Sequence, residues 1–441
     1  MEWIIIAAWL IGTLIVAIAP IILIHELGHF VFAKLANVRV EEFGLGYPPR
    51  MLKLWRDRGY LEIGTMKITI PRGFKLPEGL VAGIHADAVA ARQEDGTYVL
   101  QHIEISELEN EHPALESPPS GDDLHLRGKL TALEPGTLYS LNWLPMGGFT
   151  KMTGEEDPSD PRSLAAQPKR WRIAVMAAGS LFNIAAAVLL LCGAYTAGYP
   201  EKWLVEVSNV QAESAAEAAG LKPGDVILAI DGERLQAGMS QLQQIIRAAP
   251  GETVELTIVR DDDEMIIPAT PRPDEQGYGL LGILMSPWPD RSGIRRYRPV
   301  EALKASVVDL KSAMVATVKL PVQLAQGQVS PQEARPASMV GISEVMALTL
   351  QQSIEWGVAF PILHTASLIS LALGLTNLLP IPALDGGRIF FTLIEALRGR
   401  RISPEREAIV HLVGLAILVA LMGFIMIQDL INPVIPWSLL K

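Results

Sequence analysis

The chain has 441 residues, of which 49% are hydrophobic, and its formal net charge is −11 at pH 7. Its mean hydropathy of +0.28 is higher than water-soluble domains usually show, so several membrane-spanning segments are expected. The acidic balance argues against a nucleic-acid partner, whose phosphates require a basic surface. The single cysteine, Cys192, excludes a disulfide within the chain and a cysteine-ligated zinc site.

Four segments are long and apolar enough to span a bilayer, which takes about 20 residues of helix. They are Trp3 to about Ala36, about Trp171 to Tyr199, about Gly357 to Leu379, and Ala408 to about Leu430. Pro20 is expected to kink the first. Glu2 stands where a cleaved signal peptide carries basic residues, so this segment is expected to remain. Glu301–Ala325 is interrupted by charges and predicts an amphipathic helix, within an amphipathic or linker region at 300–356.

The distribution of basic residues predicts the orientation in the membrane. Five arginines lie in the short stretch after the third predicted span: Arg388, Arg398, Arg400, Arg401 and Arg406. Basic loops stay in the cytoplasm, so both termini and residues 200–356 are expected outside. The protein is thus predicted to be a multi-pass protein of the inner or plasma membrane.

A metal-binding pattern closes the first predicted span. Residues 25–29 read H-E-x-x-H, directly after an uncharged run from Ile4 to Ile24. On a helix, His25 and His29 project from one face about one turn apart, so both imidazoles can reach one zinc ion. Glu26 points partly aside and is expected to hold a water at the metal instead of being a ligand. Ionisable groups inside a membrane segment are costly and suggest function.

A third ligand is expected near the end of the third predicted span. Pro380 and Pro382 must interrupt a helix there, and a broken backbone at membrane depth is tolerated only where it lines a cavity or is buried in protein. Asp385 follows the break, and two glycines after it permit close approach of the backbone. The alternative is that Asp385 only caps the next helix. With H-E-x-x-H on another span, the ligand interpretation is favoured.

Two further regions lie outside the predicted spans. Residues 37–170 predict a membrane-associated β region, interrupted at 71–136 by a polar stretch that is either a small β module or a partly ordered loop. Residues 203–285 predict a compact α/β module, in which Ala218–Gly232 strongly resembles the pattern of a PDZ domain. Such domains bind an extended peptide as an added strand. The alternative is that this module is only a cap or spacer.

These motifs together resemble the site-2 protease family of intramembrane zinc metalloproteases, in particular its regulator-of-sigma-E protease branch. That family pairs H-E-x-G-H in the first span with N-x-x-P…L-D-G in the third, and here these correspond to His25–His29 and Asn377–Gly386. Three more stretches resemble family segments: Phe43–Gly46, Gly136–Phe149 and Ala178–Asn183, in which Ser180 replaces the usual proline. Residues 71–136 depart from the family as an insertion, Met339–Ile342 departs in a loop, and one PDZ pattern is present where some members have two.

The resemblance implies a polytopic α-helical membrane protein of about four transmembrane helices, with a membrane-associated β segment and an inserted α/β PDZ-like domain. It implies zinc held by His25, His29 and Asp385, with Glu26 as the general base. Asn377, Gly147 and Gly148 would position substrate. The substrates implied are single-pass, membrane-anchored proteins, often anti-sigma factors, cleaved in regulated intramembrane proteolysis.

Two other functions are compatible with parts of the sequence. A non-catalytic membrane adaptor would use its PDZ-like module to hold membrane-protein clients, but it would have no need to keep His25, Glu26, His29 and Asp385 in lipid. A zinc transporter would carry polar ligands along several spans, whereas the second and fourth predicted spans offer little beyond Asn183 and His411. Zinc stoichiometry and cleavage of a model transmembrane peptide separate the three functions.

Overall fold

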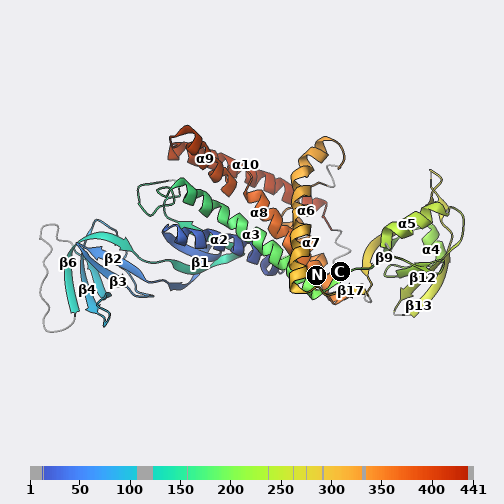
Figure 1. The fold of residues 1–441 in the computed structure, drawn as a ribbon, viewed down its shortest axis with the longest axis horizontal. Coiled ribbons are helices and arrows are strands. Elements are labelled where there is room, and N and C mark those ends of the chain that lie inside the picture. Colours follow the sequence, from blue (N-terminus) through green and yellow to red (C-terminus); the bar gives the residue numbers. More distant parts are fainter. Residues whose placement is uncertain are drawn as a thin grey trace. The chain divides into compact units, whose positions relative to one another are not determined.

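The computed structural model describes residues 12, 14–106, 123–155, 157–236, 238–261, 263–274, 276–290, 293–329 and 334–435. The chain divides into two compact units, and Figure 1 shows the elements of both. The first unit contains Met1–Val188, Leu310–Leu348 and Thr365–Lys441. The second contains Leu189–Asp309 and Thr349–His364.

Three of the described helices are long and apolar enough to cross a membrane: α3 (Lys169–Gly198), α8 (Phe360–Asn377) and α10 (Pro404–Ile431). They lie where the second, third and fourth spans were predicted. The predicted first span falls partly outside the described residues. Its described part is a π-helical turn, η1 (Leu14–Ile18), followed by α2 (Ala19–Leu35). Pro20 lies in the first turn of α2, directly after the π-helical turn.

The region predicted as amphipathic or linker contains two helices, α6 (Pro299–Ala325) and α7 (Met339–Trp356). The second was not predicted as a separate helix. Helix α9 (Asp385–Arg398) follows the break after α8 and ends at Gly399, whose φ of +70° suits glycine. The break itself spans residues 378–384, around Pro380 and Pro382, as the sequence predicted.

Strands β1 (Val40–Arg56) and β7 (Leu138–Met152) form the sheet that lies beside α2. Residues 40–45 pair with 148–152 on one side and with 138–141 on the other, and residues 50–56 pair with 138–142. Both strands therefore fold back on themselves and make four adjacent segments. Residues 148–152 form one edge of this sheet and residues 50–56 the other.

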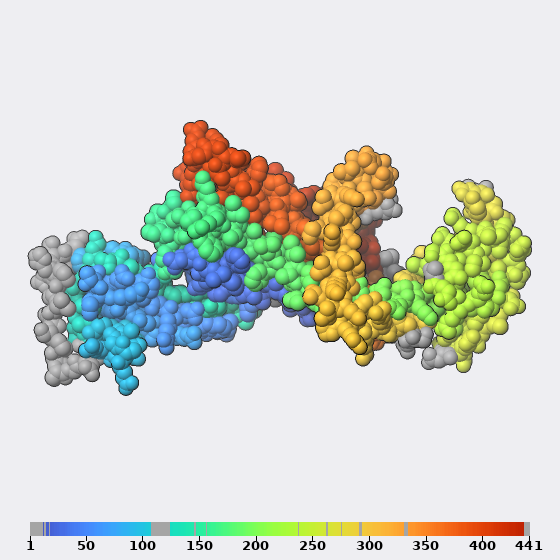
Figure 2. Space-filling model, in the orientation of Figure 1, coloured from blue at the N-terminus to red at the C-terminus, as the bar shows by residue number. Residues whose placement is uncertain are grey.

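A closed five-stranded barrel is inserted between β1 and β7. Its strands are β2 (Gly59–Ile63), β3 (Met66–Ile70), β4 (His85–Arg92), β5 (Tyr98–Ile105) and β6 (Asp123–Glu134), in the order β2-β3-β5-β4-β6. Alternate residues point inward along β2 and β4, and the five strands together bury an apolar cluster that includes Leu61, Ile68 and Leu130. The barrel is a lobe of its own, joined to the helices by β1 and β7 (Figure 2). It occupies most of the polar stretch and begins earlier, at Gly59.

In the second unit, residues 203–289 form a six-stranded sheet with two helices, α4 (Ala215–Ala219) and α5 (Gly238–Ala248). The main path of the sheet is β13 (Asp263–Ala269), β12 (Val254–Arg260), β10 (Val226–Ile230), β9 (Trp203–Val210) and β16 (Ile283–Pro289), with β11 (Glu233–Arg234) beside β10. The predicted motif places Gly220 at the end of α4 with a φ of +82°, ahead of the buried strand β10. Strand β16 is an edge strand of this sheet.

Candidate active site

Helix α2 carries the two histidines of the H-E-x-x-H motif on its buried face. His25 and His29 are 7% and 5% exposed, and their ring centroids lie 4.8 Å apart. Gly28, on the same face, allows α2 to approach α3 closely, because a Cβ there would lie 2.5 Å from the Ala178 carbonyl oxygen. The four-residue spacing and one small residue thus place both imidazoles against α3, a contact that the sequence did not predict.

Helix α3 holds the outer nitrogen of each imidazole. The His29 Nδ1–H donates to the Val175 carbonyl oxygen over 2.8 Å, which leaves the Nε2 lone pair of neutral His29 free. His25 Nδ1 lies 3.3 Å from the side-chain amide of Asn183, a residue with no exposed surface. Both Nε2 atoms therefore face away from the α3 partners and toward a common point.

Asp385 reaches that point from the start of α9. Leu384 is the N-cap, so Asp385 is the first helical residue and does not occupy the capping position. Gly386 and Gly387 let residues 378–382 fold back onto the start of the helix, since Cβ atoms there would lie 2.2 and 2.4 Å from the carbonyl oxygens of Leu379 and Ile381. The two glycines predicted to allow close approach therefore accommodate the chain's own broken segment.

Helix α10 and a nearby ion pair support this turn. The Ala383 N–H donates to His411 Nδ1 of α10 over 2.9 Å. Gly414, one turn further along α10, lies against Pro382, where a Cβ would come within 2.4 Å of the proline Cβ. Arg388, in the first turn of α9, forms an ion pair with Glu155. Helix α10 thus fixes the backbone that carries Asp385.

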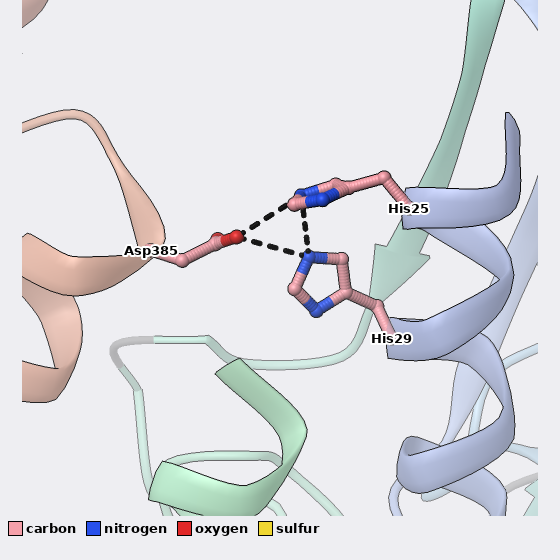
Figure 3. A group of neighbouring side chains, drawn as sticks. All are labelled: His25, His29 and Asp385. Carbon is pink, nitrogen blue, oxygen red and sulfur yellow. Dashed lines mark hydrogen bonds and ion pairs between the residues drawn. The ribbon is translucent and has the colours of Figure 1, made fainter. Parts of the chain in front are cut away.

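The three side chains converge from two elements (Figure 3). Asp385 Oδ2 lies 3.1 Å from His25 Nε2 and 3.2 Å from His29 Nε2, and the two Nε2 atoms are 3.2 Å apart. Ligands of a tetrahedral zinc ion, bound at 2.0–2.1 Å, lie about 3.3 Å from one another. An anionic oxygen and two imidazole nitrogens at this spacing suit a cation. Among the described residues, this is the one cluster of histidine, cysteine or carboxylate groups that could hold a metal.

Gly179 of α3 keeps the space beside these ligands open. A Cβ at this position would lie 2.5 Å from His29 Nε2 and 2.8 Å from His25 Nε2. Any other residue would therefore push the ligand nitrogens apart or fill the position of the ion. The donor set and this glycine-lined gap fit a zinc ion.

The residues predicted as general base and as substrate contacts lie on α2, β7 and α8, and not all of them are beside His25, His29 and Asp385. Glu26 follows His25 on α2 and interacts electrostatically with His25, His29 and Asp385. Gly147, with a φ of +83°, packs on Ile22 of α2, and Gly148 lies against Leu23. Asn377 is the half-buried last residue of α8. Among the described residues, no hydrogen bond joins Asn377 to the three ligands.

Sequence reasoning did not assign roles to the α3 residues around the ligands. Val175, Gly179 and Asn183 are four residues apart and share one face of the helix. That spacing of a small and a polar residue in an apolar helix was a usable signal. It could not indicate which other helix the face meets.

Comparison with known proteins finds zinc metalloproteases. The model of peptidase family M50 matches residues 13–66 and 129–421, and the gap falls within the barrel. Zinc metalloprotease RasP of Geobacillus kaustophilus is 27% identical, with 94% of this chain and 96% of that protein covered. Regulator of sigma-W protease RasP of Bacillus subtilis is also 27% identical, covering 94% and 97%. A putative zinc metalloprotease of Clostridium perfringens is 28% identical, covering 96% and 98%.

Among solved structures, the PDZ domain of an SdrC-like protein of Listeria monocytogenes matches 20% of this chain and 88% of that chain, with 25% identity and a TM-score of 0.18. The corresponding domain from Listeria innocua matches 19% and 92%, with 25% identity and a TM-score of 0.17. The family match covers well over half of the chain and includes both motifs that supply the clustered side chains. The resemblance seen in the sequence is thereby confirmed, and the chain belongs to peptidase family M50, the family of the site-2 proteases.

Proposed function

We propose that this protein is an intramembrane zinc metalloprotease that hydrolyses peptide bonds of single-pass membrane proteins. The observation that carries this proposal is the convergence of His25, His29 and Asp385 beside apolar helices, with donor atoms 3.1–3.2 Å apart. The relatives named as zinc metalloproteases support zinc as the cofactor. The relative named regulator of sigma-W protease supports a role in regulated intramembrane proteolysis, with anti-sigma factors as the proposed substrates.

His25, His29 and Asp385 would hold the zinc ion, which when bound would supply a water with a pKa lowered toward ~7. Neutral His25 and His29 and ionised Asp385 balance one of the two charges of the ion. Glu26 accepts the proton of the attacking water and passes it to the leaving amine. Holding Glu26 beside His25 on one helix places the base next to the ligand set.

The substrate must be unwound before its carbonyl can be attacked, because helical carbonyls are already hydrogen-bonded. The edge of the β1–β7 sheet at residues 148–152 lies beside α2 and offers backbone groups for strand addition. Gly147 and Gly148 bring that edge close to the helix of the ligands. Asn377, at the end of α8, would contact the substrate backbone.

The PDZ-like module (residues 203–285) would bind an extended peptide or protein segment along edge strand β16. Helix α5 lies beside β16 in the same unit, and Leu284 of β16 is 58% exposed. The module carries no cluster of metal-ligating groups among its described residues. It would therefore select substrates and perform no chemistry.

Glu26→Gln and Asp385→Ala test the proposal by separating the base from the ligands. Glu26→Gln should keep zinc and lose about 10²–10⁴-fold in cleavage rate, because it removes only the proton acceptor. Asp385→Ala should weaken zinc binding at least tenfold, because it removes a ligand. Metal analysis of the purified detergent-solubilised variants and cleavage of a model transmembrane peptide measure both. A fully active Glu26→Gln, or one free of zinc, would contradict the assignment of Glu26 as the general base.

A further inference from the structure

Asn183 is a buried polar residue in the middle of a membrane-spanning helix, and its side chain faces a proposed metal ligand. It has no exposed surface, and its side-chain nitrogen lies 3.3 Å from His25 Nδ1. The side-chain oxygen has no hydrogen-bond partner among the described residues. A buried amide oxygen without a partner is costly, so a donor is expected for it.

The protonation of His25 decides which end of the amide faces it. If Nε2 of neutral His25 binds zinc, its proton must be on Nδ1, and Nδ1–H is then a donor that needs an acceptor. The amide nitrogen of Asn183 is also a donor and cannot serve. The oxygen and nitrogen of an amide occupy nearly the same space, so turning the group over places Oδ1 opposite Nδ1–H. The same turn gives the orphan oxygen its partner.

The backbone of Asn183 is held by α8, the helix that leads to Asp385. Ser370 Oγ donates to the Asn183 carbonyl oxygen over 2.8 Å. Gly374, one turn further on, packs closely on the same part of α3, where a Cβ would lie 3.3 Å from the Asn183 Cβ. Asn183 is therefore fixed against α8 while its side chain meets His25 of α2.

We propose that Asn183 is a positioning residue of the metal centre, whose side-chain oxygen accepts the His25 Nδ1–H and orients Nε2 toward the ion. With the Val175 carbonyl oxygen on His29, α3 then holds both imidazoles in the same protonation form. Outer partners of this kind orient metal-bound histidines and typically change metal affinity 10–100-fold. This inference rests on the proposed assignment of His25 as a ligand.

The test is the zinc affinity of Asn183 variants of the full-length protein, measured by competition with a chelator. Asn183→Leu has a similar size and no acceptor, and its affinity should fall about 10–100-fold. Asn183→Asp keeps an acceptor and no donor, so it should bind zinc within a few-fold of the unchanged protein. If Asn183→Leu does not fold, Asn183→Ala carries the same expectation without adding bulk.

Ser180→Ala is the matched control, because Ser180 is also fully buried on α3 and its hydroxyl has no hydrogen-bond partner among the described residues. It should leave zinc affinity unchanged. Cobalt substitution adds a spectroscopic readout: the visible d–d bands should shift in Asn183→Leu, and Asn183→Asp and Ser180→Ala should keep the tetrahedral pattern. If Asn183 only supported the packing of α3, Asn183→Leu and Asn183→Asp would not differ in this way in zinc affinity and in the cobalt spectrum.

Two results would overturn the inference. Asn183→Leu that binds zinc as tightly as Ser180→Ala would show that the contact does not matter. Asn183→Asp that loses zinc as severely as Asn183→Leu would show that the amide acts as a donor and not as an acceptor. His25→Ala is measured in parallel. If it keeps full zinc affinity, the ligand assignment itself is wrong, which distinguishes failure of the proposed function from failure of the Asn183 role.

Discussion

Gly179 is the position where one methyl group should be most damaging to the metal centre. Its Cβ would lie 2.5 Å from His29 Nε2, well inside contact distance. We therefore expect Gly179→Ala to lose most of its zinc although alanine favours a helix by about 1 kcal/mol over glycine. Zinc content and circular dichroism of the purified variant measure the two effects separately.

Gly193→Ala is the control on the same helix, because a Cβ there meets only Leu363 Cδ1 at 3.7 Å, an ordinary contact distance. It should keep zinc. Gly179→Ala with a full complement of zinc would mean that the ligands shift freely and that the gap beside them has no role.

At the scale of single residues, the sequence indicated the candidate metal-binding residues, but it did not indicate the residues that pack around them. His25, Glu26 and His29 are neighbours on one helix, so their relation follows from helical periodicity alone. Asp385 could be proposed because two prolines require a break before it. Asn183 could not be assigned a role, since its partner lies 158 residues away in sequence. Contacts between helices depend on packing, which no local pattern encodes.

At the scale of elements, Thr150 joins the edge strand of the β1–β7 sheet to helix α2. Its hydroxyl donates to the Glu26 carbonyl oxygen over 2.9 Å. Thr150→Val removes this bond at nearly constant volume, and a net loss of about 1 kcal/mol corresponds to roughly a fivefold decrease. We expect cleavage of a transmembrane peptide to fall by about this factor while zinc is retained.

Thr153→Val is the comparison for this variant, because the Thr153 hydroxyl donates to Glu41, outside α2. Its activity should be unchanged. If Thr150→Val instead loses zinc in proportion to activity, the bond supports the metal centre and not the position of the strand.

Glu42 makes the stability of the β1–β7 sheet depend on pH. Burial alone would raise the pKa of Glu42, but hydrogen bonds from Arg50 and Ser140 and the charge of Arg50 outweigh burial and lower it below its usual 4.5. The unfolded chain then binds the proton first as pH falls. The stabilisation is therefore complete above about pH 4.5 and is lost below it.

Thermal unfolding in detergent tests this dependence on pH. The unchanged protein should unfold at a higher temperature than Glu42→Gln at pH 7, and the gap should narrow below pH 4.5. Glu41→Gln removes a more exposed partner, paired with Lys151 at 2.7 Å, and such surface pairs contribute only ~0–1 kcal/mol. A gap for Glu42→Gln that stays constant down to about pH 3 would show that ionisation of Glu42 is not its source.

The positions of the long apolar helices could be predicted from the sequence, because a single physical rule determines them. The apolar runs predicted α3, α8 and α10, because a spanning helix needs a minimum length. The sequence did not decide whether residues 71–136 form a β module or a loop, because closure of the barrel depends on pairing between distant strands. For example, β3 pairs in parallel with β5, and β2 with β6. The separate helix α7 was missed because its apolar residues are mixed with polar ones.

At the scale of the whole molecule, the arginines after α8 predict which side of the membrane each part faces. We expect Arg398 and the barrel in the cytoplasm and the PDZ-like module outside. On a Cys192→Ser background, intact cells would be treated with an impermeant thiol reagent. Glu233→Cys, exposed on β11, should be labelled, whereas Arg398→Cys and Glu94→Cys should be labelled only after lysis. Rapid labelling of position 398 in intact cells would contradict the predicted orientation.

The PDZ-like module is joined to the rest of its unit by a narrow neck, which makes its removal a practical test. Trp203 pairs with Pro289 where the chain enters and leaves, and the Asp290 N–H donates to the Lys202 carbonyl oxygen over 3.0 Å. Just beyond, β8 (Tyr199–Pro200) pairs with β17 (Ile294–Arg295). A short linker can therefore replace residues 203–289 without stretching the chain.

If the module only selects substrates, the deletion should keep zinc and should cleave a short transmembrane peptide at least as fast as the intact protein. The deletion variant should cleave a substrate with a bulky outer domain faster than the intact protein does, because the PDZ-like module no longer excludes that substrate. Both rates are compared in detergent with zinc content measured on the same samples. A folded, zinc-loaded deletion that cleaves neither substrate would show that the module takes part in forming the active state, beyond choosing what enters it.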